Sequence, residues 1–121
     1  DPSLPHCDLT SIERFSSVVK SFYKAKIVLA HAGGMDEWQK VADLLGGRGC
    51  YFDVAFVLEK MRKNDNAREL YRQNEDYFIF GTDTPWRDQR EYTEIIKNSV
   101  TLTHDQKDKI FYKNILKLIK I

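Results

Sequence analysis

The stretch Lys26-Ile-Val-Leu-Ala-His-Ala-Gly-Gly34 is a short apolar run that ends at a histidine and two glycines. Residues 26–30 predict a buried strand, and Gly33 and Gly34 allow the backbone to turn away where that strand ends. His31 therefore places a titratable side chain at the end of a buried element. Its role depends on whether other segments place polar groups at the same level.

Two further runs, residues 50–55 and 77–81, have the same apolar or β-branched character and predict two more strands. Strands that alternate with helices imply right-handed β-α-β units and a parallel sheet, so we expect one α/β domain over residues 1–121. The helices that separate and follow the strands are expected to start at a Thr10–Glu13 capping box, at an Asp36 cap, near Asn64, around Tyr92, and at a Thr103–Gln106 cap.

Alternation of side chains along each run divides the predicted sheet into two faces. One face is uniformly apolar and suits packing against helices. The other face mixes apolar with polar groups, and two of its three strands end in a titratable residue. The helix-facing set is Val28, Ala30, Phe52, Val54, Phe78 and Phe80, and the opposite set includes His31, Asp53 and Asp83.

His31 and Asp83 are expected to converge, because the carboxyl ends of parallel strands meet at one edge of a sheet. This holds for the mouth of a TIM barrel and for the crevice of an open doubly wound sheet, so the pattern alone does not choose between these folds. A histidine and an aspartate at such a place suit a divalent metal such as zinc, or a proton-transfer pair. We therefore treat both residues as candidate catalytic and metal-binding groups.

Each candidate also has a plain structural interpretation. His31 can be a hydrogen-bonded packing residue, and Asp83 can cap the turn at Thr84-Pro85. Asp53 is interpreted as a buried carboxylate that orients His31 from the neighbouring strand. Trp86 either lines a substrate pocket or packs in the core.

Other possible sites have weaker support in the sequence. His104 follows a helix cap and is expected to be solvated, and His6-Cys7 has no partners at metal-ligand spacing. The pair Gly33-Gly34 and the segment at residues 46–49 lack the spacing of phosphate-binding loops. The latter is interpreted as a helix stop. Cys7 and Cys50 are expected to be reduced thiols.

Composition excludes several classes of partner. The 19 basic and 18 acidic residues are spread evenly, so there is no charged footprint for nucleic acid or an anionic membrane. No apolar run approaches the ~20 residues of a membrane span, and the first residues do not form a signal peptide. These features are typical of a soluble, cytoplasmic protein. The first residue, Asp1, is not methionine, which suggests a fragment.

Three later motifs accompany the stretch 26–34. They are Tyr51-Phe-Asp-Val-Ala55, Phe80-Gly-Thr-Asp-Thr-Pro-Trp86, and the helix from Asp105 to Leu118 that contains Lys113-Asn114. Together, the four motifs resemble the closing portion of amidohydrolase-related metal-dependent hydrolases, and the resemblance spans nearly the whole chain. These are TIM-barrel proteins whose branches include enzymes like aminocarboxymuconate-semialdehyde decarboxylase.

The resemblance implies a partial (β/α)8 barrel in which the three strands match the sixth to eighth. It assigns Asp83 to the aspartate that binds the metal and takes a proton from the water bound there. It assigns His31 to a histidine that binds a second metal or acts as acid or base. The first-strand His-x-His pair and the fifth-strand histidine have no counterpart here, so zinc binding by the isolated chain is expected to be weak or absent.

Two functions are therefore expected from the sequence. The first is the carboxyl-terminal part of a metal-dependent hydrolase or decarboxylase that acts on a small-molecule substrate in a complete barrel. The alternative is a non-catalytic partial-barrel module. Because parallel strands with free edges favour association, such a module would form a homo-oligomer or pair with a chain that carries the missing strands.

Overall fold

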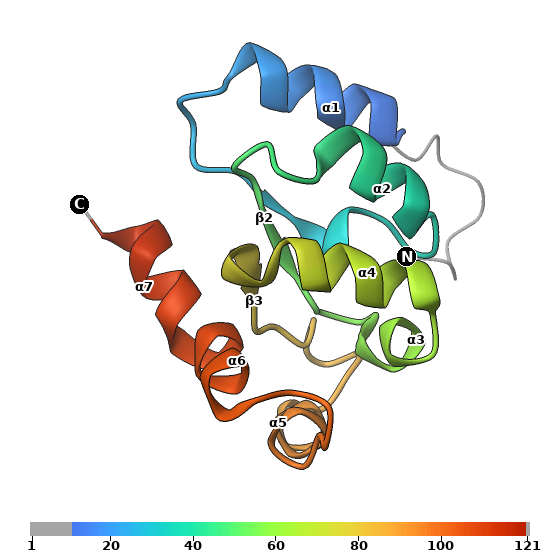
Figure 1. Cartoon of the computed structure of the whole chain (residues 1–121), viewed down its shortest axis with the longest axis vertical. Coiled ribbons are helices and arrows are strands. Elements are labelled where there is room, and N and C mark those ends of the chain that lie inside the picture. Colours follow the sequence, from blue (N-terminus) through green and yellow to red (C-terminus); the bar gives the residue numbers. More distant parts are fainter. Residues whose placement is uncertain (1–10, 121) are drawn as a thin grey trace.

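The computed structural model describes residues 11–120, so Thr10, His6 and Cys7 lie outside the described part of the chain. Helices and strands alternate as the sequence predicts (Figure 1). The elements are α1 (Ile12–Ser21), β1 (Val28–Leu29), η1 (Ala30–Gly33), α2 (Trp38–Leu45), β2 (Tyr51–Asp53), α3 (Leu58–Arg62), α4 (Asp65–Gln73), η2 (Glu75–Tyr77), β3 (Phe78–Ile79), α5 (Gln89–Lys97), α6 (His104–Asp108), η3 (Lys109–Lys113) and α7 (Asn114–Ile119).

The three strands form one parallel sheet in the order β1-β2-β3. This confirms the predicted α/β class and the predicted parallel arrangement. Each strand is shorter than the run that predicted it, because the chain leaves the sheet soon after the paired residues. Among the described residues, no helix is both long enough and apolar enough to cross a bilayer.

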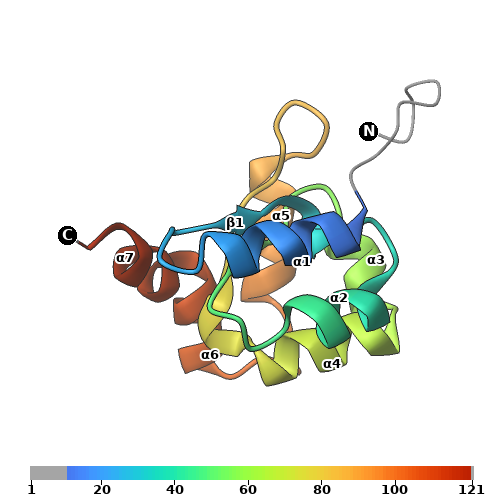
Figure 2. The same ribbon diagram turned by 90° about the horizontal axis from the view of Figure 1, so that it is seen from above.

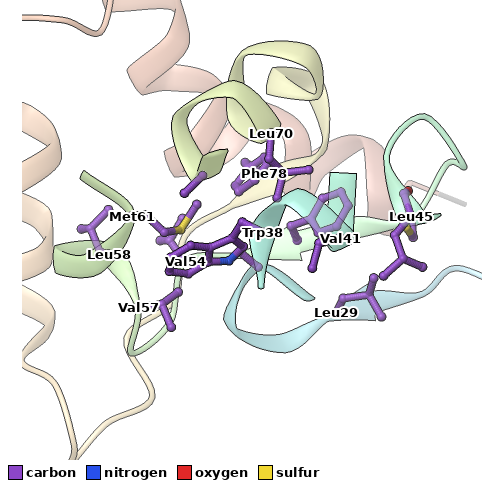
Figure 3. Packing of buried hydrophobic residues seen from close by; sticks show 14 of the residues in the cluster. Leu29, Trp38, Val41, Leu45, Val54, Val57, Leu58, Met61, Leu70 and Phe78 are labelled. Carbon is purple, nitrogen blue, oxygen red and sulfur yellow. The ribbon is translucent and has the colours of Figure 1, made fainter. Parts of the chain in front are cut away.

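The core lies between the sheet and the helices on one of its faces. From α2, Trp38, Val41 and Leu45 are buried (Figure 3), and they belong to the same hydrophobic cluster as Phe52 and Phe78 of the sheet. The Phe52 and Phe78 rings stack with centroids 5.2 Å apart. Helix α2 packs between α1 and α4, which completes a helical layer over this face (Figures 1 and 2).

The predicted faces are right for β2 and β3 but wrong for β1. Leu29 pairs in register with Phe52, and Phe52 with Phe78, so these three side chains share the helix-covered face. Val28 lies on the opposite face and is 41% exposed, and Ala30 is exposed too. The run from Ile27 to Ala30 is apolar at every position, so alternation alone could not fix which residues face the helices.

Several predicted helix starts are correct. The Asn64 side chain accepts from the Ala67 N–H, and Thr103 and Gln106 form the full capping box of α6. The predicted Asp36 cap is wrong, because α2 begins after Glu37 without a side-chain cap. Helix α1 is capped by Ser11, whose hydroxyl accepts from the Arg14 N–H at 3.2 Å.

Helix α3 was not predicted, since its five residues are too few to show a helical period. The expected stop after α2 is present: Gly46 ends the helix, and the Gly47 N–H donates to Asn74 Oδ1. Cys50 is buried and has no disulfide partner within residues 11–120, and its thiol donates to the Leu45 carbonyl.

A cluster around Lys109 ties the last helical segment to the segment that precedes β3. Lys109 Nζ lies 2.8 Å from Asp76 Oδ1 and 3.1 Å from Glu75 Oε1. This contact with Lys109 lowers the pKa of Asp76, and hydrogen bonds from Gln106 and Lys109 lower that of Glu75. The cluster fixes η3 beside the start of the third strand.

These shifts predict an acid-sensitive contribution to stability. A carboxyl whose pKa is lowered by folding stabilises the protein above its unfolded value of about 4 and loses this effect as pH falls through the lower folded value. We expect Lys109→Met to lower the free energy of unfolding at neutral pH and to weaken its fall below about pH 4. Urea unfolding across this range, with Lys60→Met as the control, measures both. Equal pH dependence in wild type and Lys109→Met would contradict the assignment.

Candidate functional site

His31 lies in a left-handed turn directly after β1. His31 has φ 57° and ψ 41°, Ala32 has φ 54°, and Gly33 has φ 81°. Glycine suits position 33 for two reasons: it tolerates the positive φ, and an added Cβ would lie 3.0 Å from Val41 Cγ1. A left-handed conformation costs a residue other than glycine about 1–2 kcal/mol, so His31 and Ala32 need neighbours that hold them there.

Asp53 supplies that support from β2. Its Oδ1 accepts the His31 N–H at 2.8 Å and the Ala55 N–H at 3.1 Å. Burial raises the pKa of the Asp53 carboxyl, and these two hydrogen bonds oppose the rise. The structure thus places Asp53 beside His31 as expected, but its hydrogen bond is to the main chain and not to the imidazole.

The turn changes the side of the sheet on which the histidine lies. Leu29 faces the helices, so an unbroken strand would direct residue 31 to the same face. Because residues 30–33 leave the strand, the His31 ring instead reaches the neighbourhood of Asp83. The two side chains meet as predicted, although the alternation argument for His31 was wrong.

The imidazole is held at one nitrogen. His31 Nδ1 lies 2.7 Å from the Ala55 carbonyl oxygen. A carbonyl accepts but does not donate, so Nδ1 carries the proton and the neutral ring keeps a lone pair on Nε2. That Nε2 is 4.0 Å from Asp83 Oδ2. In the neutral ring, Nε2 is therefore an acceptor that faces the Asp83 carboxylate across a short gap.

Asp83 also has a left-handed backbone, with φ 63°. The turn that follows is closed by its main chain, because the Asp83 carbonyl accepts the Trp86 N–H at 2.9 Å. Within the described residues the carboxylate has no hydrogen-bonded donor, which does not support the alternative that it caps the turn. The loop between β3 and α5 that carries Asp83 projects from the body of the molecule (Figure 2).

A small hollow of about 40 Å³ joins these groups. It is lined by His31, Met35, Phe56, Asp83 and Trp86. Trp86 is 60% exposed, so the core-packing interpretation of this residue is wrong. Phe56 has φ 69° and thus is, like His31 and Asp83, a non-glycine residue in a left-handed conformation. Backbone strain of this kind clusters at functional sites, which favours the hollow as one.

The sequence did not predict the contacts that Arg87, Glu59 and Tyr92 make behind the hollow. The Arg87 guanidinium lies 4.2 Å from the Phe56 ring centroid, and its Nε is 3.1 Å from Glu59 Oε1. The Tyr92 hydroxyl donates to Glu59 Oε2 at 2.7 Å. These contacts join the loop of Asp83 to α3 and α5. Nothing in the local sequence signals them, because Glu59 lies in a helix too short to predict.

The side chains at the hollow are of types that bind a divalent metal, but there are too few of them to form a complete site. An imidazole nitrogen and a carboxylate oxygen are common zinc ligands. Within residues 11–120, however, no group of three histidine, cysteine or acidic side chains is placed to hold a metal ion. His104 does not contribute, since its side chain is 92% exposed and pairs with Asp108. His31 and Asp83 thus offer two donors of this kind at the hollow.

The tautomer of His31 is a direct prediction. We expect the neutral ring to carry its proton on Nδ1, because the Ala55 carbonyl accepts from that nitrogen. Long-range ¹H–¹⁵N correlation spectra in alkaline buffer report this state, with the exposed His104 as an internal reference. A ring protonated on Nε2 would contradict the arrangement.

Comparisons with known proteins agree with this architecture. The family model described as amidohydrolase matches residues 4–121. A solved crystal structure titled as an amidohydrolase II superposes with a TM-score of 0.64 and 20% identity, over 88% of this chain. The match covers 38% of that structure's own chain. Among curated proteins, no match was found.

The strand arrangement and the superposition fit each other. Three parallel strands with flanking helices match a portion of the longer amidohydrolase chain, and this identifies the sheet as part of a barrel. At this identity the superposition shows the fold alone, whereas the family match extends over nearly the whole sequence. The chain therefore belongs to the amidohydrolase family and forms part of a TIM barrel.

Proposed function

We propose that this chain supplies the sixth to eighth strands of a metal-dependent hydrolase or decarboxylase. The observation that carries the proposal is the 4.0 Å approach of His31 Nε2 to Asp83 Oδ2. Both residues follow the carboxyl ends of parallel strands, which is where TIM-barrel enzymes place their active sites. In this assignment, residues 1–121 are the carboxyl-terminal part of the barrel domain.

The proposed roles follow from the geometry of each side chain. Asp83 presents a partly exposed carboxylate that has no hydrogen-bond donor within residues 11–120, which suits a metal ligand that also takes a proton from the attacking water. His31 presents the Nε2 lone pair, which suits an acid, a base or a second ligand. When zinc is bound at such a site, it supplies Lewis-acid activation of water at neutral pH.

The surrounding residues have supporting roles in this proposal. Asp53 positions His31 through the backbone, because its hydrogen bond holds the left-handed turn. Trp86 offers an exposed apolar surface beside the hollow and would line the pocket of a small-molecule substrate. Hydrolysis and decarboxylation both fit this set, and the resemblance to aminocarboxymuconate-semialdehyde decarboxylase favours a substrate that carries a carboxylate.

The activity belongs to a complete barrel in this account. The open face of β1 exposes Val28, and α1 and α7 each expose large apolar side chains on their flanks. In a closed barrel such surfaces pack against neighbouring strands and helices. The exposed residues are Val18 and Phe22 on and after α1, and Leu116 and Ile119 on α7.

Two substitutions test the proposed site in the assembled barrel. Asp83→Ala should weaken zinc binding by at least about tenfold, because a ligand is lost. His31→Ala should leave most of the zinc bound and lower the rate by about 10²–10⁴, as expected for an acid or base. Metal analysis and turnover measure the two effects, with the exposed Asp36→Ala as the control. Wild-type zinc content and rate in both variants would remove the proposed site.

The second candidate function is a non-catalytic module that associates through the open side of the sheet. The exposed Val28 and the outer edge of β1, which has no paired strand within residues 11–120, favour it. The outer edge of β3 is covered, because the Phe80 N–H donates to the Ile110 carbonyl and Asn114 Nδ2 donates to the Phe78 carbonyl. If it holds, the chain forms a homo-oligomer or captures a chain with the missing strands, without stoichiometric zinc. Light scattering and metal analysis of the purified chain decide this. A zinc-loaded, active chain would exclude the module, whereas an inert, metal-free oligomer would favour it.

A further inference from the structure

A second and larger cavity, of about 540 Å³, lies in the helical layer. Its floor is formed by core side chains, among them Leu58, Met61, Phe78 and Ile110. It lies between α3 and α4 on one side and the α5–α6 connection on the other. This volume is within the range of about 300–1,000 Å³ that is typical of small-molecule sites.

The cavity is separate from the hollow at His31 and Asp83. The two share no lining residue. Phe78 lines the cavity from the helix-covered face of the sheet, whereas His31 and Asp83 lie beyond the strand ends. The segments on both sides of the cavity belong to this chain.

The lip of the cavity is basic. Arg62, Arg68 and Arg72 all line it, from the end of α3 and along α4. Arg68 pairs with Asp65 and Arg72 with Glu69, while Arg62 has no ion pair within residues 11–120. No acidic residue is among those that line the cavity. An apolar floor under a basic lip suits a ligand with an apolar body and one negative charge.

We propose that this cavity binds a medium-chain monocarboxylate. The alkyl chain would lie against the partly exposed Tyr71 and Leu102, above the buried core side chains, where burial of their apolar surface favours binding. The carboxylate would lie at the lip and pair with Arg62. The polar residues Asn98, Ser99 and Thr101 line the cavity from the opposite side, in the connection between α5 and α6.

Dodecanoate is the probe, and the two methionines of the chain report its location. Met61 lines the cavity and Met35 lines the hollow at His31, so ¹³C-methyl spectra distinguish the two places. We expect saturable shifts of the Met61 methyl below the micelle concentration, with Met35 unchanged. No saturable shift of Met61, or a larger shift of Met35, would overturn the proposal.

Charge selection is tested at the lip. Arg62→Gln should weaken dodecanoate binding about three- to fivefold, the size expected for an exposed ion pair. The exposed Arg48→Gln, outside the cavity, is the matched control and should bind like wild type. Dodecanol should bind less tightly than dodecanoate, with an affinity that Arg62→Gln does not change. Equal dodecanoate affinity in wild type and Arg62→Gln, or tighter binding of dodecanol, would overturn the proposal.

Discussion

Two hydrogen bonds to a single carboxylate oxygen organise the candidate site. Asp53 Oδ1 accepts the N–H groups of His31 and Ala55, and thereby joins the turns that follow β1 and β2. Ala55 in turn presents its carbonyl to His31 Nδ1, so the same pair of turns fixes both the backbone and the ring of the histidine. The direction of Nε2 toward Asp83 follows from these contacts.

The molecule is asymmetric about its sheet. One face is covered by α2 and its neighbours, with Trp38 and Phe52 fully packed, while the other exposes Val28. The family match extends across nearly the whole chain, and the structural match covers 38% of an amidohydrolase chain. The asymmetry of the sheet is explained if these strands are one part of a barrel. The residues proposed for catalysis, His31 and Asp83, lie beyond the carboxyl ends of the strands, and the helical layer holds the separate cavity.

Sequence patterns predicted the parallel strands and the meeting of His31 with Asp83, because the positions and the ends of strands depend on local features. They failed where tertiary contacts decide. The uniformly apolar β1 gave no basis for separating Val28 from Leu29, and the left-handed turn at His31 depends on a carboxylate from another strand. The Arg87 and Glu59 contact joins a loop to the unpredicted α3, so no local pattern contains it.

The support of His31 by Asp53 is tested most directly by amide hydrogen exchange. The His31 and Ala55 amides should exchange slowly, since both donate to the same half-buried carboxylate oxygen. Asp53→Ala should release both, whereas Asp53→Asn should retain partial protection because an amide oxygen still accepts. If the His31 amide exchanges in wild type as fast as an unprotected amide, Asp53 does not hold the turn, and the proposed origin of the site is contradicted.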